Sequence, residues 1–199
     1  MLIDEQPPHV TVYDGDLGGC GQGEIGDPLT FVPALWEFLI ETYGVQSVLD
    51  LGCGLGYSTR WFQDHGMRTL GIEGSAEIAG KSGLDCIRVH DFTVGPIEHL
   101  ETFDLCWTSE FLEHVEQEFE DNIFSALKRC RTVAVTAAIP GFQGHHHVNC
   151  QPITYWIERF AIHGFWYDKT ITEFCRSYTM ESHRGSYFAS HGMIFHQHA

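Results

Sequence analysis

One short stretch constrains the fold of this chain more than any other. The apolar run Val48-Leu49-Asp50-Leu51 leads directly into three glycines at alternate positions, 52, 54 and 56, and a helix-forming segment follows. Glycines at such positions allow a tight turn and let a ligand lie against the main chain. The N–H groups at the start of the following helix can bind a carboxylate or phosphate. The stretch therefore predicts a strand, a turn and a helix that together form a ligand site.

The glycine spacing narrows the choice of ligand. A dinucleotide site needs Gly-x-Gly-x-x-Gly and a P-loop needs Gly-Lys-Ser/Thr, and neither occurs at this turn. The pattern Asp50-x-Gly52-x-Gly54-x-Gly56 instead resembles motif I of the class I S-adenosylmethionine-dependent methyltransferases. This resemblance implies S-adenosyl-L-methionine as cofactor, with its methionine part against the turn. The expected contacts in the turn are Asp50, Gly52, Cys53, Gly54 and Gly56. The alternative is an ordinary glycine-rich turn in another Rossmann-like protein.

Two acidic residues follow the next two predicted strands. Glu73, followed by Gly74, closes a strand about twenty residues beyond the turn, where an acid can accept hydrogen bonds from both ribose hydroxyls. The alternative is that Glu73 only starts the next helix. By the family resemblance, Asp91 contacts the adenine amino group and Phe92 lies beside the base. A single acid after a strand is common in proteins. The assignment of Asp91 therefore depends mainly on its being the third acid in the series Asp50, Glu73 and Asp91.

The fourth predicted strand ends at Ser109, another expected cofactor contact, and is followed by Glu110-Phe111-Leu112-Glu113-His114-Val115. This segment resembles the "EHV"-type sequence after the fourth strand of many small-molecule methyltransferases. The resemblance implies that the loop presents the methyl group to its acceptor. His114 is therefore a candidate general base.

Residues 139–152 leave the end of the fifth predicted strand and contain His145, His146 and His147. An imidazole at this edge of a parallel sheet can act as a base near neutral pH or bind a metal. Adjacent residues of an extended chain point in opposite directions, so all three cannot easily meet one ion. We therefore predict catalytic histidines and no metal, although ligands recruited from elsewhere would permit one. The three side chains could also serve only to hold the loop.

Strands and helices alternate from Val45 onward, which predicts a Rossmann-like, doubly wound α/β fold with a mostly parallel sheet. The family resemblance implies seven strands, of which the last is antiparallel. We expect one domain over 1–199, with 1–44 as an N-terminal loop and helix that could form a lid, and 45–199 as the cofactor-binding core. Helices are expected at 28–43, 58–65, 75–81, 117–130 and 154–163. Further strands are expected at 67–75, 85–89, 102–109, 131–138, 165–172 and 192–197.

The charge balance bears on the acceptor. Eleven lysines and arginines against twenty-seven acids give a net charge of −16, which disfavours nucleic acid as a partner.

The sequence has neither a long apolar run nor a basic leader, so we expect a cytoplasmic protein that does not enter a membrane. Seven scattered cysteines without a Cys-x-x-Cys pair indicate free thiols. Nothing in the sequence indicates an oligomeric state.

These features together predict methyl transfer from S-adenosylmethionine to a small-molecule acceptor. The histidines favour an oxygen nucleophile, which must lose a proton. Two alternatives remain open. One is a metal-assisted sugar or catechol O-methyltransferase, and the other is a non-catalytic module that only binds S-adenosylmethionine.

Overall fold

The computed structural model describes residues 27–142 and 144–198. Its strands are β1 (Ser47–Leu51), β2 (Arg68–Glu73), β3 (Ile87–Val89), β4 (Phe103–Ser109), β5 (Cys130–Thr136), β6 (Phe165–Tyr167) and β7 (Met193–Gln197). Its α-helices are α1 (Pro33–Tyr43), α2 (Tyr57–Asp64), α3 (Ala76–Ser82), α4 (Glu120–Leu127), α5 (Ile153–Ile162), α6 (Lys169–Ser182) and α7 (Tyr187–His191). Short 3₁₀ turns are η2 (Pro28–Thr30), η3 (Leu112–His114) and η4 (Gln117–Phe119).

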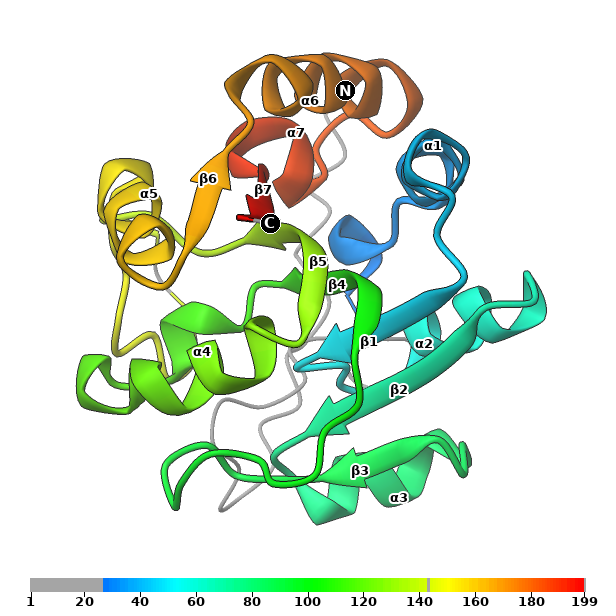
Figure 1. The fold of residues 1–199 in the computed structure, drawn as a ribbon, viewed down its shortest axis with the longest axis vertical. Helices are drawn as coiled ribbons and strands as arrows, with labels where there is room; N and C mark the ends of the chain where they lie inside the picture. Colours follow the sequence, from blue (N-terminus) through cyan, green and yellow to red (C-terminus); the bar gives the residue numbers. More distant parts are fainter. Residues whose placement is uncertain (1–26, 143, 199) are drawn as a thin grey trace, which may run out of the picture.

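The seven strands form one sheet in the order β3-β2-β1-β4-β5-β7-β6 (Figure 1). Strands β1 to β5 pair in parallel, whereas β7 lies antiparallel to both β5 and β6. This arrangement confirms the predicted fold class, including the antiparallel last strand. The strand order reverses between β1 and β4, and ligands of open α/β sheets bind at the carboxyl ends of the strands beside such a reversal.

Helices cover both faces of the sheet. Successive residues of each central strand point to opposite sides, so each strand contributes apolar side chains to a core on either face. On one face Leu49, Cys106 and Val133 pack in a core with residues of α4 and α5. On the other face Val48, Trp107 and Ala134 pack in a second core with residues of α1, α2, α6 and α7. Both faces are therefore buried, which explains why the central strands are mostly apolar.

Three predicted elements differ clearly from the structure. The expected helix over 117–130 is shorter, because residues 117–119 form the 3₁₀ turn η4, α4 ends at Leu127, and Cys130 already belongs to β5. The expected helix over 28–43 starts only at Pro33, because Val32 precedes a proline and is displaced from helical geometry, with φ −130°. The expected sixth strand over 165–172 ends at Tyr167. Asp168 then accepts a hydrogen bond from the Ile171 N–H and starts α6, a helix that the sequence analysis does not predict.

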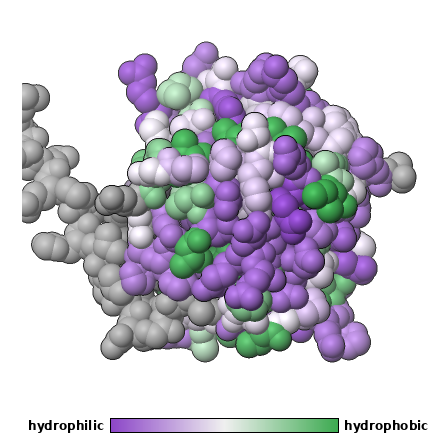
Figure 2. Space-filling view, turned by 90° about the vertical axis from the view of Figure 1, so that its left-hand side faces the viewer, coloured by the Kyte–Doolittle hydropathy of each residue, from purple (hydrophilic) through white to green (hydrophobic). Residues whose placement is uncertain are grey.

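The predicted N-terminal lid falls mostly on residues 1–26, which lie outside the described part of the chain. In the described ranges, no helix combines the length and apolar character that crossing a membrane requires. Figure 2 views the molecule from the side of α4 and α5 and shows a mainly hydrophilic face with small, separate hydrophobic groups.

Candidate functional site

The glycine turn between β1 and α2 has the geometry that its sequence predicts. Gly52, Gly54 and Gly56 all have positive φ angles, of 72°, 54° and 75°. A Cβ at Gly52 would lie 2.5 Å from carbons of the Phe111 ring, so the loop after β4 lies against the turn. Glycine is therefore required at position 52 both for its backbone conformation and for the space it leaves.

Asp50 lies beneath this turn and supports it. Its side chain is 2% exposed, and one carboxylate oxygen accepts hydrogen bonds of 2.6 Å from the hydroxyls of both Ser58 and Thr59. Burial raises the pKa of Asp50 to about 6, although the two hydroxyl hydrogen bonds act in the opposite direction. We infer that Asp50 acts on a ligand mainly by fixing the end of β1 to the start of α2.

Glu73 ends β2, directly beside the turn. One carboxylate oxygen accepts a hydrogen bond from the Gly54 N–H at 2.9 Å, and the other accepts one from the Ser75 N–H at 2.9 Å. Gly74 lies between Glu73 and Ser75 in the sequence, and Ser75 rather than Glu73 caps α3. The structure thus brings Glu73, Gly74 and the glycine turn together as the sequence predicted.

The remaining predicted cofactor contacts lie at neighbouring strand ends. Asp91 follows β3, which pairs with β2, and its carboxylate accepts hydrogen bonds from the N–H and hydroxyl of Thr93. Phe92 is only 3% exposed and packs in the core, with its ring 6.1 Å from that of Phe111. Ser109 ends β4 and shares a hydrogen bond of 2.9 Å with Thr136 of β5.

Two loops at the carboxyl ends of β4 and β5 face each other. The N–H groups of Val148 and Asn149 both donate to the carbonyl oxygen of Glu113, each at 2.9 Å. The Asn149 side chain is buried and donates to Glu120 of α4 at 2.9 Å. The histidine loop is therefore fixed against the loop that contains Glu113 and His114.

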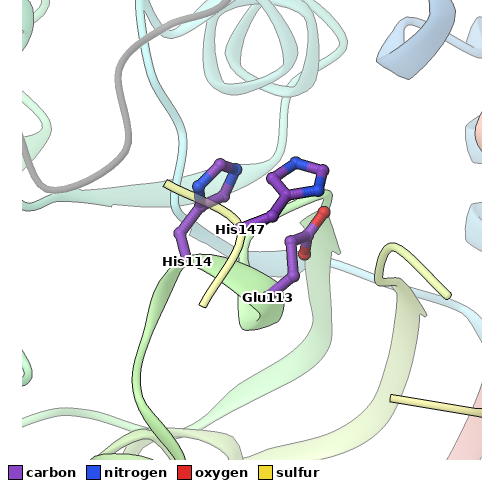
Figure 3. Close-up of side chains that lie close together, drawn as sticks. All are labelled: Glu113, His114 and His147. Carbon is purple, nitrogen blue, oxygen red and sulfur yellow. The ribbon is translucent and has the colours of Figure 1, made fainter. Parts of the chain in front are cut away.

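The side chains of Glu113, His114 and His147 meet between these two loops (Figure 3). One potential ligand atom from each lies within 4.8 Å of the others. Glu113 is fully buried, and neither of its side-chain oxygens has a hydrogen-bond partner of standard geometry among the described residues, although the N–H groups of Glu113 and Ala138 and the side chain of Glu110 lie nearby. Burial and the charge of nearby Glu110 raise the pKa of Glu113 well above its ordinary value, whereas burial lowers the pKa of His114 to about 4.

The other two predicted histidines have different environments. His145 is exposed, whereas His146 is half-buried, has a φ of 52°, and receives a hydrogen bond from the His114 ring on its carbonyl oxygen. Of the four candidate bases, His114 and His147 are brought together, with ring centroids 5.0 Å apart. The three neighbouring histidines do not converge on one point, as the alternation of an extended chain predicted.

Two members of this region, Glu113 and His191, have no role in the sequence-based prediction. For Glu113, its place next to His114 was a usable signal. Glu110, which has a φ of 51°, lies 2.8 Å from the buried ring of His191, and this ring lies 2.6 Å from the Ser190 hydroxyl. No sequence signal connects Glu110 to His191, because only the antiparallel return of β7 brings α7 to this edge of the sheet.

Comparisons with known proteins agree with this geometry. Residues 49–135 match the family model described as "Methyltransferase domain". No curated protein sequence matches the chain. Among solved structures, it is similar to a TehB-like SAM-dependent methyltransferase from Corynebacterium glutamicum, with a TM-score of 0.63, 15% identity, and coverage of 87% of this chain and 90% of that one.

Two further structures are similar to this chain. One is the plantazolicin methyltransferase BpumL in complex with a triazolic desmethylPZN analog and SAH, with a TM-score of 0.60, 12% identity and 86% of both chains covered. The other is an S-adenosylmethionine-dependent methyltransferase from Mesorhizobium loti, with a TM-score of 0.57, 17% identity, and coverage of 83% of this chain and 96% of that one. At these identities the likeness concerns the fold.

Proposed function

We propose that this chain, whose residues 49–135 match the model of a methyltransferase domain, is a class I S-adenosylmethionine-dependent methyltransferase that methylates a hydroxyl oxygen of a small molecule. The family model supports the family predicted from the motifs, and the similar plantazolicin methyltransferase structure, which holds SAH, supports the predicted cofactor. S-adenosylmethionine supplies a methyl group on a positively charged sulfur. The predicted cofactor contacts suit this molecule. The glycine turn after β1, Glu73 at the end of β2 and Asp91 after β3 lie at the ends of adjacent strands, where one extended ligand could reach all of them.

On the cofactor side, each residue has a separate task. The turn at Gly52, Gly54 and Gly56 would hold the methionine part against the backbone. Glu73 would exchange its contacts with backbone N–H groups for the ribose hydroxyls, and Asp91 would accept from the adenine amino group. These groups bind and orient the cofactor, which provides the alignment that a displacement reaction needs.

On the acceptor side, the cluster of Glu113, His114 and His147 carries the proposal of an oxygen acceptor. A hydroxyl must lose its proton to become a good nucleophile, whereas burial keeps His114 neutral at physiological pH. A neutral imidazole beside the buried carboxyl group of Glu113 is suited to handle that proton. The net charge of −16 supports a small acceptor, because it repels polyanionic nucleic acid. A methyltransferase for the natural product plantazolicin shares the fold.

The test is a methyl-transfer assay with radiolabelled S-adenosylmethionine and matched sets of phenols, catechols, sugars, amines and thiols. We expect label in hydroxyl compounds only, with NMR of the product locating an O-methyl group. Methylation confined to amines or thiols would contradict the oxygen acceptor. Saturable cofactor binding with no transfer to any class would favour the non-catalytic module.

A further inference from the structure

We propose that Glu113, His114 and His147 bind a divalent transition-metal ion, and that Zn²⁺ is the ion their ligand types suit best. Their three ligand atoms already lie within 4.8 Å of one another (Figure 3). Bond lengths of about 2.0–2.2 Å to zinc place ligands of one ion about 3.4 Å apart, so small side-chain rotations complete the site. Two imidazoles and one carboxylate are a ligand set of catalytic zinc sites.

Glu113 provides the first independent support. Its carboxyl group is 0% exposed, yet neither oxygen has a hydrogen-bond partner of standard geometry among the described residues. A buried polar group without a partner is costly and rare in folded proteins. A bound cation would supply the missing partner and would also offset the negative charge of the neighbouring Glu110.

The orientation of His114 provides the second. Its Nδ1 lies 3.2 Å from the carbonyl oxygen of His146, and a carbonyl can only accept a hydrogen bond, so Nδ1 carries the proton. The lone pair of the neutral ring is then on Nε2, where a metal can bind. Histidine ligands of metals usually donate their other N–H to a carbonyl or carboxylate in this way.

The backbone conformation around the cluster is fixed by contacts that need no ion. Two N–H groups of the histidine loop hold the carbonyl of Glu113, and an added Cβ at Gly144 would overlap the His147 ring. His114 and His147 are only half-buried, so the cluster remains accessible from one side. A cation with three protein ligands there keeps a coordination position for a further oxygen.

The site itself is inferred from these contacts, whereas its role rests on the proposed function. An acceptor hydroxyl bound at the open position would have its pKa lowered by the cation. Its O–H bond would then break with the electron pair remaining on oxygen and the proton passing to solvent. With the ion bound, His114 and His147 would act as ligands, and the cation would replace neutral His114 in the activation of the acceptor hydroxyl. His145 and His146 are the histidines of the predicted set that are free of the metal.

The experiment is a titration of the metal-free full chain with Co²⁺, whose visible absorption reports its ligands, followed by displacement with Zn²⁺. We expect one ion per chain and a higher melting temperature with Zn²⁺. His147→Ala and Glu113→Gln should each weaken Co²⁺ binding by at least about tenfold. His145→Ala is the matched control, since this exposed side chain belongs to the same loop, and it should bind as the parent does.

Two outcomes would overturn the proposal. One is a folded parent protein that binds neither ion, and the other is parental affinity in both His147→Ala and Glu113→Gln. Circular dichroism of each metal-free variant separates lost ligands from lost folding, and Glu113→Gln preserves the side-chain shape if His147→Ala unfolds. The titration uses neither cofactor nor acceptor. A failure of metal binding is therefore distinct from a failure of methyl transfer.

Discussion

Asp50 is a buried acid whose affinity for protons changes when the chain folds. Its pKa is about 6 in the folded protein, against about 3.9 for an unfolded aspartate. The folded state thus binds the proton more tightly, so the free energy of unfolding falls as the pH rises between these values. Between pH 4.5 and 7.5 we expect this residue to reduce the unfolding free energy by about 2 kcal/mol.

Asp50→Asn removes this titration but keeps an oxygen that can accept from Ser58 and Thr59. In urea unfolding, the stability of the variant relative to the parent should therefore increase by about 2 kcal/mol from pH 4.5 to 7.5. Asp64→Asn, at an exposed position near the end of α2, serves as the control. An Asp50→Asn stability difference that is equal at both pH values would contradict the prediction.

Glu73 should contribute to cofactor affinity more than to folding. Glu73→Ala removes an ionised acceptor for the ribose hydroxyls, and we expect S-adenosylhomocysteine to bind more weakly by on the order of 1–3 kcal/mol in titration calorimetry. Glu77→Ala, on the exposed surface of α3, is the matched control. Equal affinity for both variants would mean that the ribose does not meet Glu73.

At this scale the sequence could place the residues of the predicted cofactor side, whereas their contacts with a cofactor stay predictions. Asp50 and Glu73 lie at the ends of β1 and β2, and Asp91 follows β3, so local sequence determines their positions. Glu113 and His147 come from loops that meet only after β4 and β5 have paired. His191 depends on a still more distant return of the chain, which no local pattern encodes.

At the scale of elements, the turn between β1 and α2 depends on its contact with the loop after β4. Gly52→Ala would place a methyl group 2.5 Å from the Phe111 ring and at a positive φ of 72°. Gly44 also has a positive φ, of 61°, but a Cβ added there would have no atom within 4 Å, so Gly44→Ala is the matched control. Both should lose about 1–2 kcal/mol of stability from backbone strain, and Gly52→Ala should lose more.

A double-mutant cycle isolates the steric part of this effect. Adding Phe111→Ala to Gly52→Ala should recover part of the lost stability, because the two side chains compete for one space. Thermal melts of the four proteins measure the coupling. Strict additivity would show that the ring moves away without cost.

The elements differed in how well their sequences predicted them. Helices such as α2 and α5 have apolar residues on one face and glycine soon after their ends, so their ranges agree within about two residues. Helix α6 was missed because its buried residues are Thr172, Cys175 and Thr179, whose spacing is helical but whose side chains are weakly apolar. Strand β6 was predicted too long because apolar and β-branched residues continue into this helix.

At the scale of the whole molecule, cofactor binding should stabilise the fold. S-adenosylhomocysteine at a hundredfold excess over its Kd adds about 2.7 kcal/mol to the unfolding free energy. For a chain of this size that corresponds to a rise in Tm of about 5–10 °C. NAD is the control ligand, because the turn lacks the dinucleotide spacing, and it should leave Tm unchanged. An equal shift with both ligands would contradict the assigned cofactor.

The position of β7 between β5 and β6 has a consequence for the synthesis of this protein. Residues 193–197 are made after both of the strands with which they pair in the sheet. Until they emerge from the ribosome, β5 presents an apolar, unpaired edge, and such edges promote association between chains. A nascent chain that stalls before Met193 would thus contain the paired strands β1 to β5, with the exposed edge of β5 free to pair with another chain. The growing polypeptide is therefore expected to depend on chaperones most during this late interval.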